Sequence, residues 1–456
     1  MITMLKEKLK DTSYVFVLTA IIIGFCLAVL NPPFQECDGL SHFRRAMDVS
    51  YGNFLGSFCN LTHENGVINV PENFSEMPYF IATPNAKEGG YLGYLLRNMT
   101  FSSEKIMVPD SSSVTSFVYW PQGIGIWLGR TLKLNVFFVV LLAKLFNLIA
   151  YVALTFMAIK KMPVFKNLML AIALMPITLY QAASLSPDSV LNGVTFLFIA
   201  LCFNYAVGDS KEQLSWKNTI ILGFLLLIMF LCKYVYICLG LLVFMIPSEK
   251  FGDKKNYWKS FVISILPILI LGGYVFLRVA PDVTTSDTQI ASDGMTQLQY
   301  LMGKPVMFIK VFRSTILMYF NEYLRQMDIF GNLNYELTLI NIICPCVIAC
   351  IGCLEGSSLP DNFSRKNRVL SLLAFLLTFY WIIMALYIAD PIANPVGGSV
   401  SAGVQGRYFV GILILPFIAL ASKNIKITIK HWMYKICFVM ILMDIYSIMM
   451  LYRYCY

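Results

Sequence analysis

Residues 134–158 have the sequence LNVFFVVLLAKLFNLIAYVALTFMA, in which Lys144 is the one charged side chain. A helix of this length rises about 37 Å, which is enough to cross the hydrocarbon core of a membrane. Only 13% of the 456 residues are charged, whereas soluble domains contain about a quarter. The sequence therefore predicts an all-α polytopic membrane protein. Similar apolar runs lie at 14–30, 167–183, 189–207, 260–279, 337–353, 369–388, 407–422 and 433–451.

Basic residues between the apolar runs predict how the chain is oriented. Lys6, Lys8 and Lys10 precede the first run, and cytoplasmic loops of membrane proteins are rich in Lys and Arg. We therefore expect a cytoplasmic amino terminus and a first helix that is not cleaved off. The run at 218–247 contains Lys233 near its middle, so we expect it to cross twice as two short helices. The total prediction is about 11 transmembrane helices.

Two segments between the runs are long enough to fold outside the membrane. They are a loop or cap at 31–113 and a second extracytoplasmic segment at 281–334, both within one integral membrane domain that spans 1–456. Inside the second segment, 305–325 has the apolar spacing of a helix, with Lys310 on its polar side. A further crossing there would contradict the charge pattern, so we expect an interfacial helix.

Charged side chains are concentrated directly after the first apolar run, in the stretch NPPFQECDGLSHFRRAMDVSYGN at 31–53. A structural interpretation is that the first Asp caps a helix that begins near Gly39, while the other charges face water. A functional interpretation is that a carboxylate acts as general base beside a cation that binds phosphate. The spacing leaves both open. The charged and titratable residues are Glu36, Asp38, His42, Arg44, Arg45 and Asp48.

Two more charged residues border apolar runs. Asp188, within SLSPDS at 184–189, either caps the helix that follows or belongs to a functional site. Arg407, within VQGRYF at 404–409, either extends to the membrane surface or holds an anionic headgroup through its two-pronged guanidinium. Both residues are candidates for a site at the outer ends of the helices.

Other polar groups inside apolar runs favour structural roles. Lys144 and Asp444 are costly to place in lipid, and a structural ion pair is favoured over a proton pathway. Cys346, Cys350 and Cys353 share one helix face, but buried thiols are favoured over a metal site because metal binding needs thiolates. We therefore expect no metal ion.

Motif searches exclude several classes of function. The sequence has no Gly-rich dinucleotide pattern, no Walker motif and no His-Glu-x-x-His, so no cofactor is expected. The formal charge of +9 comes mainly from the clusters that set topology, so no nucleic acid partner is expected. Cys37 and Cys59 are the two cysteines of the first loop, and a disulfide between them and two independent thiols are equal alternatives.

Four pieces of the sequence carry a resemblance: PPFQECDGLSHFRRA at 32–46, SLSPDS at 184–189, KYVYI at 233–237 and QGRYF at 405–409. The chain resembles a family of bacterial multi-span membrane proteins of largely unassigned function. The layout of that family is similar to the GT-C fold glycosyltransferases that use polyprenyl-phosphate sugars. The family pattern after the first helix is Asp-Glu-x-x-His-x-x-Arg, and Gly39 stands here in place of its Glu.

The resemblance implies a GT-C-like fold in the bacterial cytoplasmic (inner) membrane, with the active site on the extracytoplasmic face. An acidic residue of the first loop would deprotonate the acceptor hydroxyl, which attacks the anomeric carbon of a sugar on a lipid phosphate. Asp38 matches the acidic position, and Glu36 is the alternative base. The donor phosphate would be bound by Arg45, Arg407 and Lys233, and His42, Arg44 and Asp188 would bind the acceptor or support the site.

The leading functional hypothesis is a membrane glycosyltransferase that moves a monosaccharide, such as glucose, from a polyprenyl-phosphate donor to a cell-surface polysaccharide such as O-antigen. A transporter or flippase of lipid-linked sugars, or a polysaccharide polymerase or ligase, are the alternatives. A transporter favours ionisable residues at mid-membrane, whereas here the charges concentrate at the outer face under a large loop. This asymmetry favours the enzyme, with a lipid-linked sugar donor, a glycan acceptor and membrane lipid as its partners.

Overall fold

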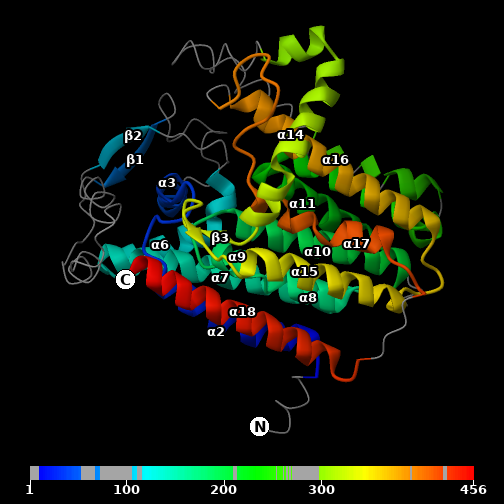
Figure 1. The fold of residues 1–456 in the computed structure, drawn as a ribbon, viewed down its shortest axis with the longest axis horizontal. Coiled ribbons are helices and arrows are strands. Elements are labelled where there is room, and N and C mark those ends of the chain that lie inside the picture. The colour runs from blue at the N-terminus through cyan, green and yellow to red at the C-terminus, as the bar shows by residue number, and fades with distance from the viewer. Residues whose placement is uncertain are drawn as a thin grey trace.

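The computed structural model describes residues 10–52, 67–71, 105–109, 116–208, 213–252, 254–259, 261–262, 265–266, 269, 297–390, 393–424 and 429–456. The described part of the chain is mostly helical (Figure 1). Six of its helices are long and apolar enough to cross a membrane. They are α2 (Thr12–Leu30), α7 (Val136–Lys161), α10 (Asp188–Val207), α15 (Ile340–Leu354, continued by the 3₁₀ turn η7, Glu355–Ser358), α16 (Arg365–Ala389) and α18 (Trp432–Cys455).

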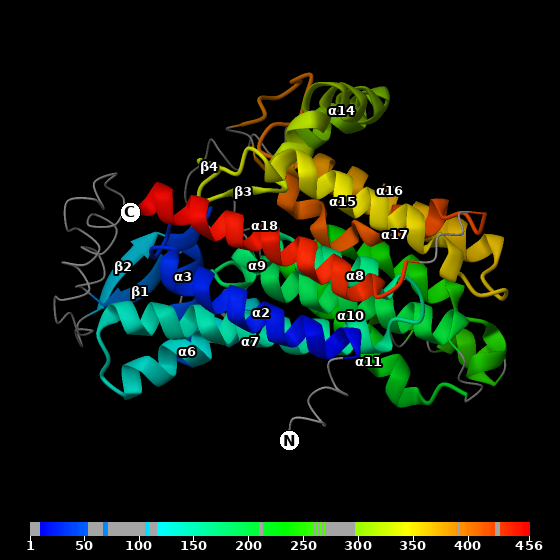
Figure 2. The ribbon, with the colours of Figure 1, turned by 60° about the horizontal axis from the view of Figure 1, so that its bottom comes forward.

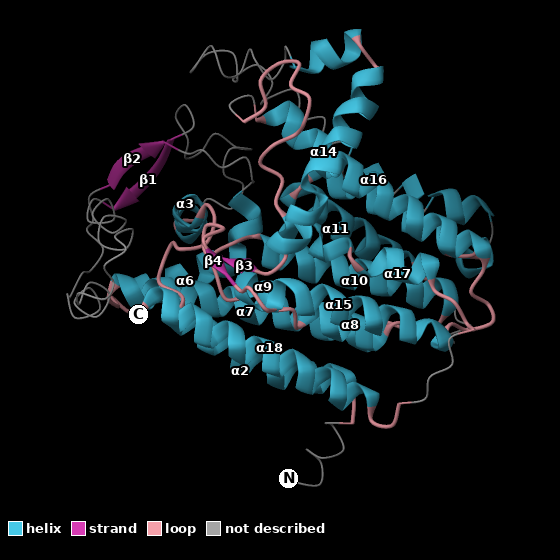
Figure 3. Ribbon diagram, in the orientation of Figure 1, coloured by secondary structure: helices cyan, strands magenta, loops and turns pink. Residues whose placement is uncertain are grey.

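Shorter elements connect and cover these six helices. The shorter α-helices are α3 (Gly39–Ser50), α6 (Trp120–Thr131), α8 (Lys166–Ala173), α9 (Pro176–Ala182), α11 (Trp216–Cys232) and α17 (Ile414–Leu420). The helix α14 (Val306–Gln326) has 21 residues but is not among those apolar enough to cross a membrane. The 3₁₀ helices are η4 (Ser116–Tyr119), η5 (Tyr234–Met245), η6 (Ser248–Phe251) and η8 (Gly406–Ile412). Two antiparallel strand pairs, visible in Figure 3, are β1 (Val67–Pro71) with β2 (Lys105–Pro109) and β3 (Ile329–Phe330) with β4 (Tyr335–Glu336).

The most buried of the long helices is α10, which lies inside the helical bundle (Figures 1 and 2). It packs along α7 and also contacts α9, α11, η5 and η8. Almost every residue of α10 is buried, including the polar ones at its first turn. Because neighbours surround α10, any chemistry at its amino-terminal end takes place in a site enclosed by protein.

The helix α2 packs between α7 and α18, and α18 runs beside it in both views (Figures 1 and 2). Side chains fix where two of these helices begin. The Asp11 carboxylate accepts a hydrogen bond from the Ser13 backbone N–H at 2.9 Å, and Asn135 Oδ1 accepts one from the Phe137 N–H at 3.0 Å. Each bond satisfies an N–H group that has no partner inside its own helix.

Two of the predicted spans are divided in the structure, so the single helices predicted there are wrong. The run at 167–183 forms α8 and α9, because Pro176 lacks an N–H and cannot continue the first helix. The run at 407–422 forms η8 and α17, and Pro416 cannot donate to the carbonyl of Ile412, where η8 ends. Most of the run at 260–279 lies outside the described residues, and a count of about 11 crossings stays a prediction.

The prediction of two short helices on either side of Lys233 is confirmed. The first, α11, ends at Cys232, and η5 begins at Tyr234. Lys233 itself has extended backbone angles, φ −150° and ψ 105°. The break therefore presents a lysine at a position where neither helix continues.

The helix predicted at 305–325 is confirmed as α14. Its buried side carries Val311 and Tyr323, whereas Lys310 and Arg313 are exposed. The part of α14 that contacts the bundle packs against η8, α15 and α16. A position of α14 at the membrane interface remains a prediction.

Candidate functional site

Three of the four sequence pieces that carry the resemblance meet at the amino-terminal end of α10. Asp188 is the first residue of that helix, and its Oδ1 lies 2.8 Å from Lys233 Nζ. Its Oδ2 lies 3.7 Å from Arg407 Nε. We call these three residues the ionic cluster. It joins α10, the break between α11 and η5, and the first turn of η8.

The fourth piece, after α2, is tied to the same place. The Leu185 backbone N–H donates to Glu36 Oε1 at 2.9 Å. The thiol of Cys37 lies within electrostatic range of Arg407, Asp188 and Asp38. All four pieces therefore contribute to one region of the molecule, although they are separated widely along the chain.

The sequence before Arg407 explains how η8 approaches so closely. A Cβ atom on Gly406 would lie 2.0 Å from the Tyr323 carbonyl oxygen, so no other residue fits there without a shift of the backbone. The Gly406 N–H also donates to Gln326 Oε1 at 3.1 Å. These contacts with α14 fix the start of η8 and with it the position of Arg407.

Neutral polar groups complete the surroundings of the cluster. Gln181 Nε2 donates to Asp188 Oδ2 at 3.1 Å, and Asn192 Nδ2 donates to Gln181 Oε1 at 3.3 Å. The ring of Tyr408 lies beneath both cations, with Lys233 Nζ 3.6 Å and the Arg407 guanidinium carbon 5.4 Å from its centroid. Aromatic rings attract cations at such distances, so the cluster is held from two sides.

The charges of the ionic cluster do not balance. One carboxylate faces two cations, so one formal positive charge remains. The Arg407 side chain is 7% exposed and that of Lys233 is 23% exposed, but the ammonium nitrogen of Lys233 is itself buried, so both positive charges are enclosed by protein. A partly enclosed cation of this kind attracts a phosphate or carboxylate more strongly than an exposed one does, because water screens it less.

The helix α3 forms a second wall through His42. Its Nδ1 shares a hydrogen bond of 2.8 Å with the Tyr119 hydroxyl of η4. Burial, with the positive charges of Arg407 and Lys233, lowers the pKa of His42 to about 3, although the Asp188 carboxylate opposes the change. The imidazole is therefore neutral at physiological pH and supplies one donor and one acceptor nitrogen.

The predicted phosphate ligand Arg45 is buried next to η4. Its Nη1 donates to Ser116 Oγ at 3.3 Å, and that hydroxyl donates to Asp48 Oδ2 at 3.3 Å. These bonds attach α3 to η4. The neighbouring Arg44 is half-buried on α3. The structure thus places Arg45 in the wall behind His42, whereas Lys233 and Arg407 share one carboxylate.

The two candidate bases, Asp38 and Glu36, have different surroundings. Asp38 is exposed and has left-handed backbone angles, φ 59° and ψ 19°. It stands at the start of α3 without a side-chain hydrogen bond to the helix, so the predicted capping bond does not form. Glu36 is 3% exposed and is engaged with the Leu185 N–H. Asp38 is therefore the carboxylate that a molecule from solvent can reach.

The structure leaves no room for a side chain at position 39. A Cβ atom at this position would lie 2.8 Å from the Phe34 Cα and 3.0 Å from the Glu36 carboxyl carbon. Glu36 fills the space that a side chain at position 39 would need. The carboxylate beside position 39 is therefore that of Glu36, which is buried and accepts a hydrogen bond from the Leu185 N–H just before α10.

All four pieces of the site lie within a part of the chain that matches a known protein family. A model of the family described as predicted membrane protein DUF2142 matches residues 21–416, which include all four pieces of the site. The chain belongs to the DUF2142 family. No curated protein and no solved structure matches it. The family description supports a membrane protein and assigns no activity to it.

One expectation about buried polar groups of this DUF2142 protein is wrong. Lys144 and Asp444 do not pair: Lys144 Nζ donates to the Asn31 carbonyl at 2.7 Å, and neither carboxylate oxygen of Asp444 has a hydrogen-bond partner within the described chain. The Lys144 ammonium has its partner at the end of α2, where the backbone carbonyl of Asn31 accepts its hydrogen bond. Cys346, Cys350 and Cys353 lie on the side of α15 that the protein leaves exposed, and Cys344 is buried; because α15 is apolar enough to cross a membrane, the expectation that hydrocarbon keeps the three thiols protonated stays a prediction. The helical spacing put three cysteines on one face but did not show which side that face is on.

The remaining cysteine prediction lies partly outside the described residues. Cys37 is buried, and its thiol donates to the Gly331 carbonyl at 3.5 Å. Cys59 lies outside the described part of the chain, so the proposed bridge stays a prediction. Among the described residues, no group of three or more His, Cys, Asp or Glu side chains is placed to hold a metal ion.

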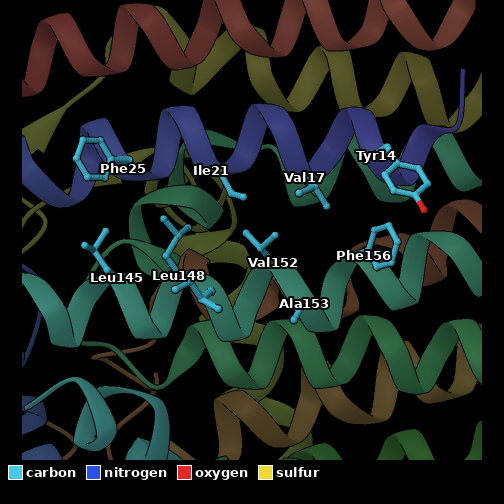
Figure 4. A pocket seen from close by; sticks show the side chains of 10 residues that line it. Tyr14, Val17, Ile21, Phe25, Leu145, Leu148, Val152, Ala153 and Phe156 are labelled. Carbon is cyan, nitrogen blue, oxygen red and sulfur yellow. The ribbon is translucent and has the colours of Figure 1, made fainter. Parts of the chain in front are cut away.

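The DUF2142 chain also has a groove between α2 and α7. Unlike the ionic cluster, it is lined by apolar and aromatic side chains. It has a volume of about 600 Å³, and its side chains include Tyr14, Phe25, Leu148 and Phe156 (Figure 4). Because both helices are long enough to cross a membrane, we expect hydrocarbon chains to cover this groove. It contributes no polar group to catalysis.

Sequence reasoning identified the three charged residues of the cluster but missed several neutral partners. Gln181 is a polar residue in the apolar run 167–183 and is for that reason a detectable signal. Tyr408 follows Arg407 directly in the sequence, but an aromatic neighbour in sequence does not show that its ring lies against two cations. Tyr119 and Ser116 gave no signal, because nothing in the sequence connects them to α3.

Proposed function

We propose that this DUF2142 protein is a membrane glycosyltransferase that moves a monosaccharide from a polyprenyl-phosphate donor to a cell-surface polysaccharide such as O-antigen. The observation that carries the proposal is the ionic cluster, with its excess positive charge, near the exposed Asp38. The proposal includes a GT-C-like fold in the bacterial inner membrane, a cytoplasmic amino terminus and an active site on the outer face.

The cations are assigned to the donor phosphate. As the bond between the anomeric carbon and the phosphate oxygen breaks, the leaving phosphate keeps the electron pair and gains charge. Lys233 and Arg407 stabilise that charge, and Arg407 offers the two parallel N–H groups that suit phosphate oxygens. Asp188 holds both cations in place before the donor binds, so little reorganisation is needed.

Asp38 is assigned to the acceptor. Its carboxylate takes the proton of the acceptor hydroxyl while the hydroxyl oxygen forms a bond to the anomeric carbon. The proposal favours Asp38 over Glu36 because the Glu36 carboxylate is buried and already accepts a backbone hydrogen bond. In this proposal Glu36 positions the segment 184–189, and His42 and Arg45 position α3.

The test is glycosyl transfer by the purified full-length protein in lipid nanodiscs. The donors are polyprenyl-phosphate sugars, glucose first, and the acceptors are lipid-linked O-antigen oligosaccharides. We expect transfer by the wild type and a rate lower by a factor of about 10² to 10⁴ for Asp38→Asn. Asp361→Asn is the matched control, because Asp361 is exposed and pairs with Lys423 elsewhere in the molecule. Turnover of Asp38→Asn at the wild-type rate would exclude Asp38 as the base.

A transporter or flippase of lipid-linked sugars is the second candidate. It is favoured by Asp444, a buried carboxyl on the long helix α18 without a hydrogen-bond partner in the described structure, since such groups mark ion or substrate pathways. The same purified protein, reconstituted into liposomes, separates the candidates. Movement of an intact fluorescent polyprenyl-phosphate sugar between leaflets of a liposome, without transfer to an acceptor, would favour the transporter. A lengthened glycan built from whole repeat units would instead indicate a polymerase or ligase.

A further inference from the structure

A small cavity lies beside the ionic cluster but is built from other residues. It has a volume of about 260 Å³, is open on one side, and is lined by the carboxyl-terminal half of α14, by Leu333 and by residues 401–405, which precede η8. The cavity is small for a drug-sized ligand, since such pockets usually hold about 300 to 1,000 Å³. Its size suits one ring of a sugar better than the long tail of a lipid.

Two tyrosine rings form part of the cavity wall. Tyr319 and Tyr323 are neighbours on α14, with ring centroids 6.3 Å apart and planes inclined by 30°. The faces of aromatic rings pack well against apolar C–H groups. The two faces of a pyranose ring present such C–H groups, whereas its hydroxyls point outward from the rim.

Hydrogen-bonding groups lie around these rings. Glu322 is held by Arg325, whose Nε and Nη2 donate to its two oxygens at 2.9 Å. Those hydrogen bonds lower the pKa of the Glu322 carboxyl below its usual value, so it is an ionised acceptor at neutral pH. Gln326 Nε2 donates to the same carboxylate at 3.0 Å. The cavity therefore has a fixed acceptor along one side.

Two further polar atoms have no partner within the described structure. They are the hydroxyl of Tyr323, a residue that is 3% exposed, and Oε1 of Gln405. A buried polar group without a hydrogen bond costs free energy, and a ligand that supplies one recovers it. No Lys or Arg lines the cavity, so its chemistry suits an uncharged polyhydroxylated ligand rather than an anion.

The cavity and the ionic cluster share one segment of chain. Gln405 lines the cavity, and Arg407 two residues later pairs with Asp188. Tyr323 packs against the ring of Phe409, with centroids 5.5 Å apart, and its carbonyl touches Gly406. A ligand in the cavity is therefore placed beside the segment that positions Arg407.

We propose that this cavity binds one uncharged sugar ring, stacked on Tyr319 beside the buried Tyr323 and hydrogen-bonded to Glu322 and Gln405. The proposal rests on the glycosyltransferase function above and adds the class of group bound next to the cations. The ring belongs either to the acceptor glycan or to the donor, and the kinetic part of the test distinguishes these sources.

The first test measures binding and needs no transfer activity. Full-length protein in nanodiscs is titrated with methyl glycosides of glucose, galactose, mannose and N-acetylglucosamine, observed by saturation-transfer NMR. We expect saturation of at least one glycoside, with affinity reduced about 3- to 10-fold in Tyr319→Ala and retained in Tyr319→Phe. Phe320→Ala is the matched control, because it removes a neighbouring ring of α14 that does not line the cavity.

Gln405→Leu is a second variant that tests the site in case Tyr319→Ala does not fold. It removes an oxygen that has no partner in the described structure, so the fold should tolerate it while glycoside affinity falls. The proposal is overturned if no glycoside is saturated by the wild type. It is also overturned if Tyr319→Ala and Gln405→Leu bind as the wild type does.

The second test uses transfer kinetics. A higher KM of Tyr319→Ala for the acceptor places the acceptor ring in the cavity, and a higher KM for the donor places the donor sugar there. If transfer occurs and neither KM changes, the cavity proposal fails while the glycosyltransferase proposal stands. If glycosides bind at Tyr319 but no transfer is found, the glycosyltransferase proposal fails while the sugar site stands.

Discussion

Buried carboxyl groups occur in two regions of this protein that differ in their partners. At the ionic cluster, Asp188 is paired with Lys233 and Arg407 and accepts a hydrogen bond from Gln181. Near α15 and α18, Asp328 and Asp444 are within electrostatic range of each other; the Cys344 thiol is the hydrogen-bonding neighbour of Asp328, and neither carboxyl is paired with a cation within the described residues. The first region therefore maintains charge, and the second favours neutral, protonated carboxyls.

This difference shows that burial alone does not identify a functional acid. An ionised buried group needs compensating charges, whereas an uncompensated one takes up a proton instead. We therefore assign phosphate binding to the compensated region. The following predictions test whether the two regions differ in the way that their partners imply.

The largest effect is expected for Asp188→Ala. The variant leaves Lys233 and Arg407 buried without a counter-charge, which typically costs about 3 to 5 kcal/mol. We expect a large fall in thermal stability in detergent together with loss of transfer. Asp361→Ala is the control and should change stability by less than about 1 kcal/mol, because its pair with Lys423 is exposed. A stable Asp188→Ala protein would mean that the cations find other partners.

The next effect is a pH dependence that originates at Asp328. Burial raises the pKa of its carboxyl from 3.8 to about 8. The unfolded chain therefore loses this proton at a lower pH than the folded chain, and the contribution of Asp328 to stability falls as pH rises from about 4 to about 8. Asp328→Asn cannot lose a proton. We expect the stability of the wild type relative to this variant to fall by at most about 1.4 kcal/mol per pH unit in that window.

Thermal unfolding of both proteins between pH 4 and pH 9 measures this difference. Parallel curves for the wild type and Asp328→Asn would show that Asp328 is ionised in the folded protein. In that case the two regions would not differ in their charge state.

A smaller effect is expected for Arg407→Lys. The variant keeps the positive charge beside Asp188 but loses the planar fork that matches two phosphate oxygens. We expect affinity for a polyprenyl-phosphate sugar to fall about tenfold, equal to about 1.4 kcal/mol, with little change in stability. Arg453→Lys on α18 is the control. Unchanged donor affinity in Arg407→Lys would leave Arg407 as a structural partner of Asp188 only.

The smallest effect is expected for Asp444→Asn. If the carboxyl is protonated in the fold, the amide replaces it with similar shape and no charge, and stability should change by less than about 1 kcal/mol. Thermal unfolding at pH 7 measures this. A loss of several kcal/mol would show that Asp444 is charged, and the contrast with Asp188 would disappear.

The sequence predicted much of the helical framework because long apolar runs have few alternatives in a membrane. It also predicted the break at Lys233, because a lysine interrupts such a run. It did not predict the division of 167–183, because Pro176 lies within a continuous apolar run, although proline ends helices by removing an N–H. The proline was a local signal for the end of a helix, but the hydropathy of the whole run favoured a single helix.

Candidate site residues were predicted because charge is rare in this chain and is therefore conspicuous. Their partners depend on packing between distant segments, which the sequence alone does not determine. Lys144 pairs with a backbone carbonyl instead of Asp444 because α2 ends beside it. The roles of Arg45 and Arg407 differ for the same reason: one points towards η4 and the other towards α10.

The ionic cluster also has a consequence for how the protein is made. Because a chain is synthesised from its amino terminus, Asp188 enters the membrane first, Lys233 follows soon after, and Arg407 arrives much later. A lone arginine costs about 2.5 to 3.5 kcal/mol at the centre of an inserting helix. Here Asp188 is already in place when Arg407 is inserted. Its carboxylate pairs with the guanidinium and lowers the free-energy cost of inserting η8. Ribosome-bound chains stopped before Arg407 should contain the Asp188–Lys233 pair alone.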